Sequence, residues 1–534
     1  MRPGPADAGR SVGRLAVGTA TAVFLTLAAG SARAQQPAPT APDAAVAAAH
    51  SVSCTSKPGE RSDCPADTSK GVALVHSTGE SPCLLGKTWG YTDSAVWVSD
   101  GCGAVFFLGA EQKPAARVEA APAPVTPEQP KEPEKKKLLE HIPNVGFRLF
   151  EGDKGQMYLR IFSYVRYLNQ KGLDPSYTDF FGNTHAIQIR EDVQLNKVFF
   201  PFSGWFLTPK FRYYLYVWSQ NPAQGEGAQV VAAGNLSYTF NRFLTLGGGI
   251  TSLPGVRSTE GQFPYWLGVD DRLIADEFFR PSYTEGFWAK GEIVSNLKYM
   301  AMAATSMSIL GVSASQLDQG LNTQSFSLAW LPTTGEFGLY GTFGDYDDHD
   351  FVATRLGAHW THSREDKQTQ PGTNSIENTQ IRLTDGSIIF TRDLFGPGIN
   401  VDRVTYQMAS LDGGIKYKGF SLEAEYYWRR LSNFTGSNTE GIEPIQDHGF
   451  QIQSSAMVLP KRLQVYLSGS AIRGHYGDGS EIRAGANWYF LKERGLRLNA
   501  EWMHLNHCPV GYNAVPYPVG GDGDVFHTNM EMNF

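Results

Sequence analysis

The sequence predicts an all-β protein: a transmembrane antiparallel β-barrel of sixteen strands, with eighteen left open, preceded by a small disulfide-stapled domain and a linker. Three observations predict this fold. The first residues resemble an export signal, segments of alternating polarity fill the chain from about residue 155, and the sequence ends in an amphipathic strand at Phe534. The composition agrees, because 57 glycines, 23 tyrosines and only 19% charged residues suit a barrel whose apolar residues occupy alternate positions.

Residues 1–34 have the features of a secretory signal peptide. An uncharged apolar run and an Ala-Arg-Ala cleavage site follow three basic residues, Arg2, Arg10 and Arg14. The run is too short, and too rich in Ala, Thr and Gly, for a membrane span. We therefore expect export with cleavage after Ala34. The Ala/Pro/Gln-rich residues 35–47 are expected to be disordered.

Residues 48–110 are predicted to form a separate domain that contains four of the five cysteines. These are Cys54, Cys64, Cys83 and Cys102. In an exported chain, such a cluster predicts two disulfides, and three pairings are possible. A zinc site is the alternative, but it is disfavoured because no Cys-x-x-Cys pair is present. Cys508 is expected to remain unpaired.

This domain resembles a small domain of unknown function found in exported bacterial proteins. The resemblance rests on the four cysteines, on Trp89-Gly90-Tyr91 and on Trp97-Val98. About sixty residues need cross-links to fold alone, so these residues are expected to be structural. Binding of cell-wall glycan or of a periplasmic partner is the alternative, because aromatic side chains often serve recognition. Residues 111–141, rich in Pro, Ala, Glu and Lys, are expected to be a linker.

Residues 142–534 are predicted to form the barrel. In the last strand, Phe526, Met530 and Met532 share one face, whereas His527, Asn529 and Glu531 share the other. This strand resembles the carboxy-terminal strand of bacterial outer-membrane barrels. We expect it to close the barrel by pairing with the strand near Met157, and its polar face to line the lumen beside Arg160 and Arg166.

Short and long connections alternate between the predicted strands, as in outer-membrane barrels. Short turns are expected at Ser203-Gly204, Asn241-Arg242 and Lys418-Gly419, among others. Long loops are expected at residues 252–285 and 506–523, among others. Residues 363–402 fit either one long loop or a further hairpin, which leaves the choice between sixteen and eighteen strands open.

Basic side chains recur on the polar face of the predicted strands. The candidate pore-lining residues are Arg160, Arg166, Lys210, Arg212, Arg355, Arg483 and Arg497. Fixed cations inside a narrow wall of low dielectric constant would concentrate anions. The alternative is that they pair with carboxylates of the same face, such as Glu481 and Glu501, and that passage is unselective.

The long segment from Thr251 to Glu285 is the candidate for an inward-folded loop that narrows the pore. Its charged residues are Asp270, Asp271, Arg272, Asp276, Glu277 and Arg280. Opposite charges across a constriction would create a transverse field that selects small polar solutes. A solvated external loop is an equally good interpretation.

No cofactor, metal site or catalytic group is expected. The acidic run Asp345 to Asp350 offers oxygen ligands for a cation, but acidic loop tips are usually only solvated. We find no nucleophile elbow, phosphate-binding loop or zinc-protease helix. A barrel-borne hydrolase would need a Ser/His/Asp set that the spacing does not provide, so an enzyme is not expected.

The span from about Gly155 to Phe534 resembles the phosphate-selective porin O and P family of Gram-negative outer membranes. The resemblance rests on Lys416 to Tyr427, on Arg190 to Leu195 and on the last strand. It implies a homotrimeric channel for passive diffusion of small hydrophilic solutes, in some members anions such as phosphate. The barrel would contact outer-membrane lipid, and the N-terminal domain would be periplasmic.

Two further expectations concern partners. The net charge of −7 makes nucleic acid an unsuitable partner. The lysine run Lys135 to Lys137 is expected to be a solvated charge cluster, and contact with anionic lipid or peptidoglycan is the alternative. The alternative function is an outer-membrane anchor whose N-terminal domain binds cell-wall glycan or a periplasmic partner.

Overall fold

The computed structural model describes residues 51–69, 71–79, 81–108, 139–220, 229–260, 266–308, 320–338, 341–370, 380–512 and 514–534. The predicted signal peptide, the segment 35–47 and most of the predicted linker lie outside these residues. The chain divides into two compact units, residues 1–131 and 132–534, and each is described by itself. Among the described residues, no helix is both long and apolar enough to cross a membrane.

The N-terminal unit consists of two three-stranded antiparallel sheets. Their strand orders are β1-β6-β3 and β2-β5-β4. The bounds are β1 Ser51–Thr55, β2 Arg61–Pro65, β3 Val72–Ser77, β4 Trp89–Thr92, β5 Ala95–Ser99 and β6 Gly103–Leu108. Gly90 is required for packing, because a Cβ there would meet the Trp97 ring at 2.7 Å. This close approach explains the glycine of the Trp-Gly-Tyr motif.

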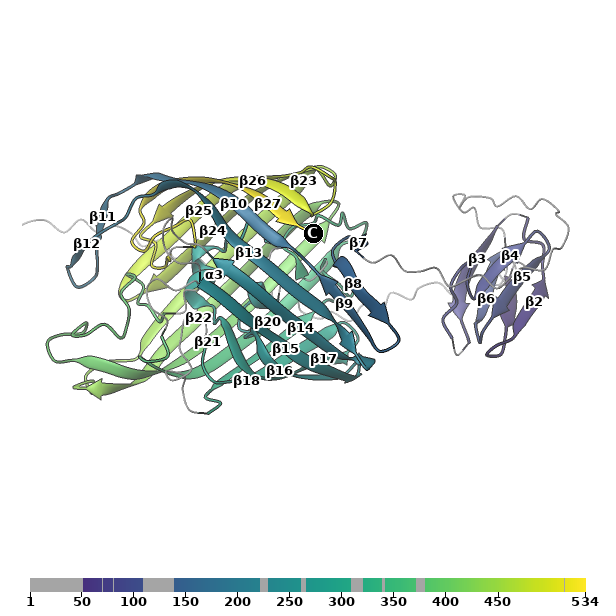
Figure 1. Ribbon diagram of the computed structural model, residues 1–534, viewed down its shortest axis with the longest axis horizontal. Helices are drawn as coiled ribbons and strands as arrows, with labels where there is room; N and C mark the ends of the chain where they lie inside the picture. Colours follow the sequence, from purple (N-terminus) through teal and green to yellow (C-terminus); the bar gives the residue numbers. More distant parts are fainter. Residues whose placement is uncertain are drawn as a thin grey trace, which may run out of the picture. The chain divides into compact units, whose positions relative to one another are not determined.

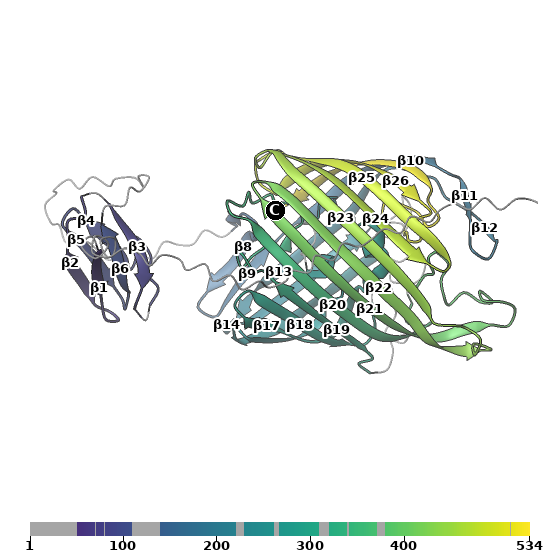
Figure 2. The same cartoon turned by 180° about the vertical axis from the view of Figure 1, so that it is seen from behind.

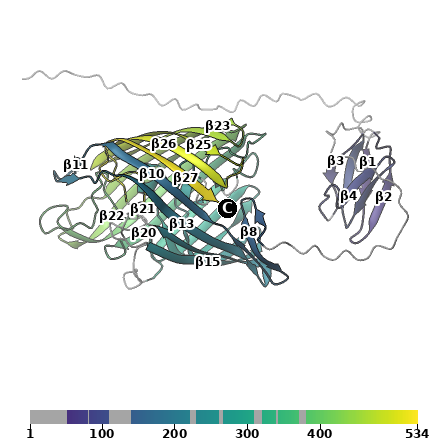
Figure 3. The ribbon, with the colours of Figure 1, turned by 45° about the horizontal axis from the view of Figure 1, so that its top comes forward.

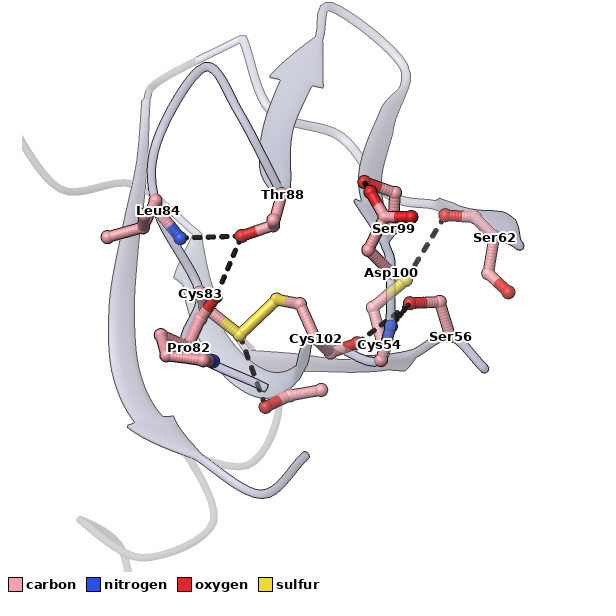
Figure 4. Close-up of a disulfide and its surroundings, with 12 residues drawn as sticks. Cys54, Ser56, Ser62, Pro82, Cys83, Leu84, Thr88, Ser99, Asp100 and Cys102 are labelled. Carbon is pink, nitrogen blue, oxygen red and sulfur yellow. Dashed lines mark hydrogen bonds between the residues drawn. A yellow bond between two sulfur atoms is a disulfide. The ribbon is translucent and has the colours of Figure 1, made fainter. Parts of the chain in front are cut away.

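Two disulfides cross-link this unit, which resolves the pairing that the sequence left open. Cys54 bonds to Cys64 and thereby joins the two sheets, and Cys83 bonds to Cys102. Figure 4 shows the second bond, beside a loop in which the Thr88 hydroxyl donates a hydrogen bond of 2.8 Å to the Pro82 carbonyl. The small core around them includes Trp89, Val96 and Phe106.

Removal of the bond between the sheets should destabilise the N-terminal unit alone. The double change Cys54→Ser and Cys64→Ser is expected to lower its free energy of unfolding by about 2–5 kcal/mol, as for other small exported domains. Limited proteolysis of the full chain during a thermal ramp measures the effect. Cys508→Ser is the matched control, since Cys508 is unpaired. Loss of protease resistance in the barrel would contradict the prediction.

The second unit is a closed antiparallel barrel. Sixteen of the described strands form the ring, and β10 pairs with β27 to close it. Figure 3 shows β27 beside β10 and β26. The bounds are β10 Phe162–Leu173, β13 Glu191–Phe206, β14 Thr208–Gln220, β15 Gln229–Asn241, β16 Leu244–Ser252, β17 Tyr283–Val294, β18 Leu297–Ala304, β19 Thr323–Trp330, β20 Ala353–Asp366, β21 Asn400–Tyr417, β22 Phe420–Ser437, β23 Ile445–Leu459, β24 Leu463–Gly474, β25 Gly477–Tyr489, β26 Leu496–Asn506 and β27 Gly523–Asn533.

Short strands extend the barrel sheet at one place and form a hairpin in one loop. The segments β7 His141–Ile142, β8 Gly146–Gly152 and β9 Gly155–Leu159 continue the sheet where β9 pairs with β13. The strand predicted from Met157 to Tyr167 is therefore interrupted at residues 160–161, and the closing strand pairs with β10. The hairpin comprises β11 Ser176–Thr178 and β12 Thr184–Ala186.

The barrel wall carries its apolar side chains outside and its polar side chains inside. In β27, Phe526 is 43% exposed and Met530 is 51% exposed, whereas His527 and Asn529 are fully buried. A water-soluble sheet protein would show the reverse arrangement, so the outer surface is built for lipid. The predicted transmembrane barrel is confirmed. Figure 2 shows the longest strands, β21 and β22, side by side in the wall.

A charge on this outer surface should destabilise the barrel. Leu467 lies in the middle of β24 and is 56% exposed. Leu467→Arg is expected to cost about 2–4 kcal/mol, the usual penalty for arginine near the bilayer midplane. Urea unfolding of the refolded protein in lipid vesicles measures the cost. Lys461→Arg, in the turn between β23 and β24, is the control, and equal stability of the two variants would contradict a lipid-facing position for Leu467.

Most predicted connections are confirmed, and the strand count is resolved. No described residue between Asp366 and Asn400 belongs to a strand, and the closed ring of described strands has sixteen members rather than eighteen. The turn predicted at Ser203-Gly204 is wrong. Both residues lie within β13, and the turn comes at Leu207, with a φ of 62°. Gly204 serves a close approach, because a Cβ there would meet the Gln156 carbonyl oxygen at 1.8 Å.

Candidate functional site

Between β16 and β17, the described residues 253–260 and 266–282 fold into the barrel. They contain the short helices α2 Arg257–Glu260 and α3 Ile274–Phe279. Every residue of α3 is buried, and Figure 1 shows this helix among the barrel strands. The two ends of the segment meet, because the Leu253 amide donates a hydrogen bond of 3.1 Å to the Ser282 carbonyl. We call residues 253–282 the inserted segment.

Contacts with the inner face of β22–β25 hold the inserted segment. The Arg257 amide donates a hydrogen bond of 3.0 Å to Glu425 in β22, and the Ile274 amide donates one to Glu481 in β25. The Phe279 ring stacks on Tyr427, with 5.2 Å between centroids and 4° between planes. Gly449 makes room for this ring, since a Cβ there would meet Phe279 at 2.2 Å.

Three of the predicted pore-lining arginines bind backbone carbonyls of the loops inside the barrel. Arg166 donates to the carbonyls of Val269 and Ala514, at 3.0 and 2.7 Å. Arg483 donates to the carbonyl of Arg272 at 2.8 Å, and Arg497 donates to that of Trp266 at 3.0 Å. These arginines point inward as predicted, but they are buried against loops inside the barrel.

The charged residues of the inserted segment are largely paired. Asp270 accepts hydrogen bonds from the Tyr164 hydroxyl at 2.7 Å and from Lys197 at 3.0 Å. Asp271 pairs with Arg483 at 2.7 Å. The other four predicted charged residues have partners within the segment. These contacts are Asp276 with the Ser258 hydroxyl at 2.8 Å, Glu277 with Arg280 at 2.6 Å, and Arg272 over the Trp266 ring at 3.9 Å.

A cavity of about 920 Å³ lies between the inserted segment and the inner faces of the strands from β13 to β20. Six basic and three acidic side chains line it, an excess of three positive charges. The basic residues are Lys197, Arg212, Arg272, Lys290, Lys298 and Arg355, and the acidic ones are Glu260, Asp270 and Glu336. We call this space the lumen cavity.

Each carboxylate of the lumen cavity already has a cationic or histidine partner. Asp270 pairs with Lys197 at 2.9 Å, Glu260 with Arg355 at 2.7 Å, and Glu336 with His349 at 2.8 Å. In contrast, three exposed cations make no ion pair or hydrogen bond with any described residue. These are Arg212, Lys290 and Lys298. The free positive charge of the lumen cavity is therefore concentrated on β14, β17 and β18.

Five of the seven predicted pore-lining residues do not line the lumen cavity, namely the three buried arginines described above, Arg160 and Lys210. Arg160 donates a hydrogen bond of 2.8 Å to Asn533, at the end of the closing strand. Lys210 is exposed near the turn at Leu207. Arg212 and Arg355 do line the cavity. Lys290 and Lys298 also line the cavity but were not among the predicted pore-lining residues. Lys290 shares a strand face with Trp288, and Lys298 shares one with Met300, a pattern on two adjacent segments that could have placed both lysines inside.

The acidic run at Asp345, the free Cys508 and one cluster that the sequence did not indicate are held by structural contacts. Asp345 accepts hydrogen bonds from the amides of His349 and Gly419, at 3.2 and 2.8 Å, so its carboxylate caps a turn. The thiol of Cys508 is buried, and burial raises its pKa, which keeps it unreactive. Asp271, Glu501 and His527 lie close together, but Arg483 occupies both carboxylates.

The fold and the inserted segment define a sixteen-stranded transmembrane barrel of the outer-membrane type. Residues 51–122, which include all six described strands of the N-terminal unit, match a family described as a protein of unknown function, DUF3011. No curated protein matches the sequence.

Solved structures that resemble the chain are outer-membrane barrels. OmpT of Vibrio cholerae has a TM-score of 0.45 and 10% identity, over 72% of this chain and 99% of that one. The anion-selective porin from Comamonas acidovorans has a TM-score of 0.44 and 10% identity, over 71% and 100%. The channel DcaP of Acinetobacter baumannii has a TM-score of 0.45 and 9% identity, over 73% and 100%.

Proposed function

We propose that the barrel is a passive channel of the bacterial outer membrane that prefers small anions, phosphate among them. A sixteen-stranded barrel is wide enough to hold an aqueous lumen. The observation that carries the proposal is the lumen cavity, in which every lining carboxylate is paired whereas Arg212, Lys290 and Lys298 make no ion pair with any residue that the structure describes. Unpaired cations in a confined, low-dielectric space attract anions and repel cations.

The ion preference is measured by the reversal potential in a planar bilayer with a salt gradient. In a potassium chloride gradient, the reversal potential of the wild-type channel is expected to have the sign that indicates preference for chloride over potassium. Lys290→Gln combined with Lys298→Gln should move this potential toward zero, since two of the three unpaired cations are lost. Lys461→Gln, in the turn between β23 and β24, is the control and should leave it unchanged. A wild-type potential of the opposite sign would overturn anion preference, and absence of stepwise currents would overturn the channel.

We further propose that the channel assembles as a homotrimer and that the N-terminal unit lies in the periplasm. The apolar outer wall of one barrel can pack against that of another. The two disulfides of the N-terminal unit suit an oxidising compartment. Mass measurement of the detergent-solubilised protein tests the trimer. Protease treatment of intact and permeabilised cells tests the compartment.

A second candidate function is anchoring, in which the N-terminal unit binds cell-wall glycan or a periplasmic protein. The observation in its favour is a set of exposed apolar side chains on this small unit, including Leu84, Leu85 and Tyr91. Sedimentation of the full chain with purified peptidoglycan, with and without residues 48–110, tests this function. Equal sedimentation of both forms would exclude it.

A further inference from the structure

The inner faces of β14–β17 form a shallow trough between Arg212 and Trp288. Arg212 pairs with Ser237, Ser237 with Gly247, and Gly247 with Trp288. The two residues between the cation and the indole are therefore small. The Trp288 ring lies directly on Gly247, because a Cβ at Gly247 would meet the ring at 2.1 Å. This glycine lets the indole lie flat along the wall.

Two positive charges lie at this trough. The Lys290 ammonium is 5.1 Å from the centroid of the Trp288 ring, and Arg212 lines the same cavity. Both side chains are exposed at the lumen cavity, and neither makes an ion pair with a described residue. An anion bound between them would be attracted by both charges.

The indole of Trp288 adds an unsatisfied donor. Trp288 is only 6% exposed, and its Nε1 has no hydrogen-bond acceptor among the described residues. A buried N–H group without an acceptor costs free energy. A carboxylate has two oxygens, so it can accept from the indole and from a neighbouring cation at once.

Aromatic rings continue from this point along the same face of β14. Tyr214 and Tyr216 follow Arg212 at alternate positions, with 5.7 Å between their ring centroids. Trp218 comes next, and the Lys197 ammonium lies 4.8 Å from its centroid. The path therefore begins and ends with a cation and has three aromatic rings between them. Inorganic phosphate has no group that would use these rings, whereas a planar apolar ring would pack on them.

We propose that the trough binds aromatic carboxylates, with the carboxylate at Arg212, Lys290 and the Trp288 N–H and the ring on Tyr214 and Trp288. This inference rests on the proposed anion channel and names the class of anion that it favours. It assigns Trp288 and Tyr214 to recognition of the ring. It assigns Arg212 and Lys290 to recognition of the charge.

The test is the block of chloride current through single channels of the full chain by added sodium benzoate, with acetate and phosphate as comparison anions. We expect benzoate to halve the current at a concentration at least tenfold below that of acetate or phosphate. Trp288→Leu and Tyr214→Leu should each remove most of this preference for benzoate. Arg212→Gln should weaken the block by benzoate and acetate together. Trp288→Phe keeps a ring and removes the N–H, so it should retain part of the preference, and it replaces Trp288→Leu if that variant fails to fold.

The outcomes separate this inference from the proposed function. Equal block by the three anions, or strongest block by phosphate, would overturn the aromatic-carboxylate site while leaving an anion channel intact. A preference for benzoate that survives both leucine variants would overturn the assignment to the trough. A channel that selects cations would overturn the proposed function itself, whatever benzoate does.

Discussion

Deletion of the inserted segment is expected to raise the single-channel conductance several-fold. The segment is packed on the inner face of β22–β25, so it closes off that half of the lumen and leaves the lumen cavity on the other side. Conductance follows the open cross-section, and a sixteen-stranded barrel without an internal loop leaves a wide aqueous channel. Replacement of residues 255–280 by two or three glycine and serine residues is the variant to record in planar bilayers.

The geometry makes this deletion feasible without opening the barrel wall. Ser252 and Tyr283 are already paired across β16 and β17, and Leu253 is hydrogen-bonded to Ser282. A short linker can therefore join the two strands as a hairpin. The wall residues that lose their partners, such as Glu425 and Glu481, would face lumen water, which can hydrate them. Unchanged conductance would show that ions do not pass beside the segment.

A milder variant controls for damage caused by the deletion. Gly449→Leu places a side chain where the Phe279 ring now lies, because even a Cβ there would be 2.2 Å from that ring. We expect the helix α3 to leave the wall and the current to become noisier and intermediate in size. Gly441→Leu, between β22 and β23 with open space around its Cβ, is the matched control and should conduct as the wild type does.

The alternation of polar and apolar residues was sufficient to predict the barrel and the inward direction of its arginines. In β26, for example, Arg497 and Glu501 are buried, whereas Leu498 and Trp502 are about 40% exposed, as their parity predicts. Parity alone could not predict what an inward side chain contacts. Arg166, Arg483 and Arg497 lie on the inward face of their strands, as Arg212 does. Only the position of the inserted segment and its neighbouring loops decides that these three arginines bind backbone carbonyls.

Glycines were the other source of error, because their role depends on partners distant in sequence. Gly204 was interpreted as a turn residue, yet it lies inside β13, where the Gln156 carbonyl approaches it. From the sequence, Gly247 and Gly449 indicate only that a strand is weakened at these positions. Each is needed under one ring, Trp288 and Phe279 respectively, and both rings come from segments far from the glycine in sequence.

Loss of the Arg483 guanidinium is expected to cause the largest loss of stability of any single change in the lumen. Arg483 is buried and pairs with Asp271 at 2.7 Å, with Glu501 at 3.2 Å and with Glu481. Arg483→Gln would leave buried carboxylates without their common cation. Breaking a buried ion pair by removing one partner costs about 3–5 kcal/mol. Urea unfolding in lipid vesicles, followed by tryptophan fluorescence, measures this cost.

Two further variants show whether the cost comes from uncompensated charge. Arg473→Gln in β24 also removes an arginine, but Arg473 is 56% exposed and lies 3.8 Å from the exposed Asp478. It should cost no more than about 1 kcal/mol, as is usual for surface pairs. Adding Glu481→Gln to Arg483→Gln removes one of the stranded charges and should recover part of the lost stability. A double variant that recovers none of the stability lost in Arg483→Gln would contradict charge compensation as the source of the cost.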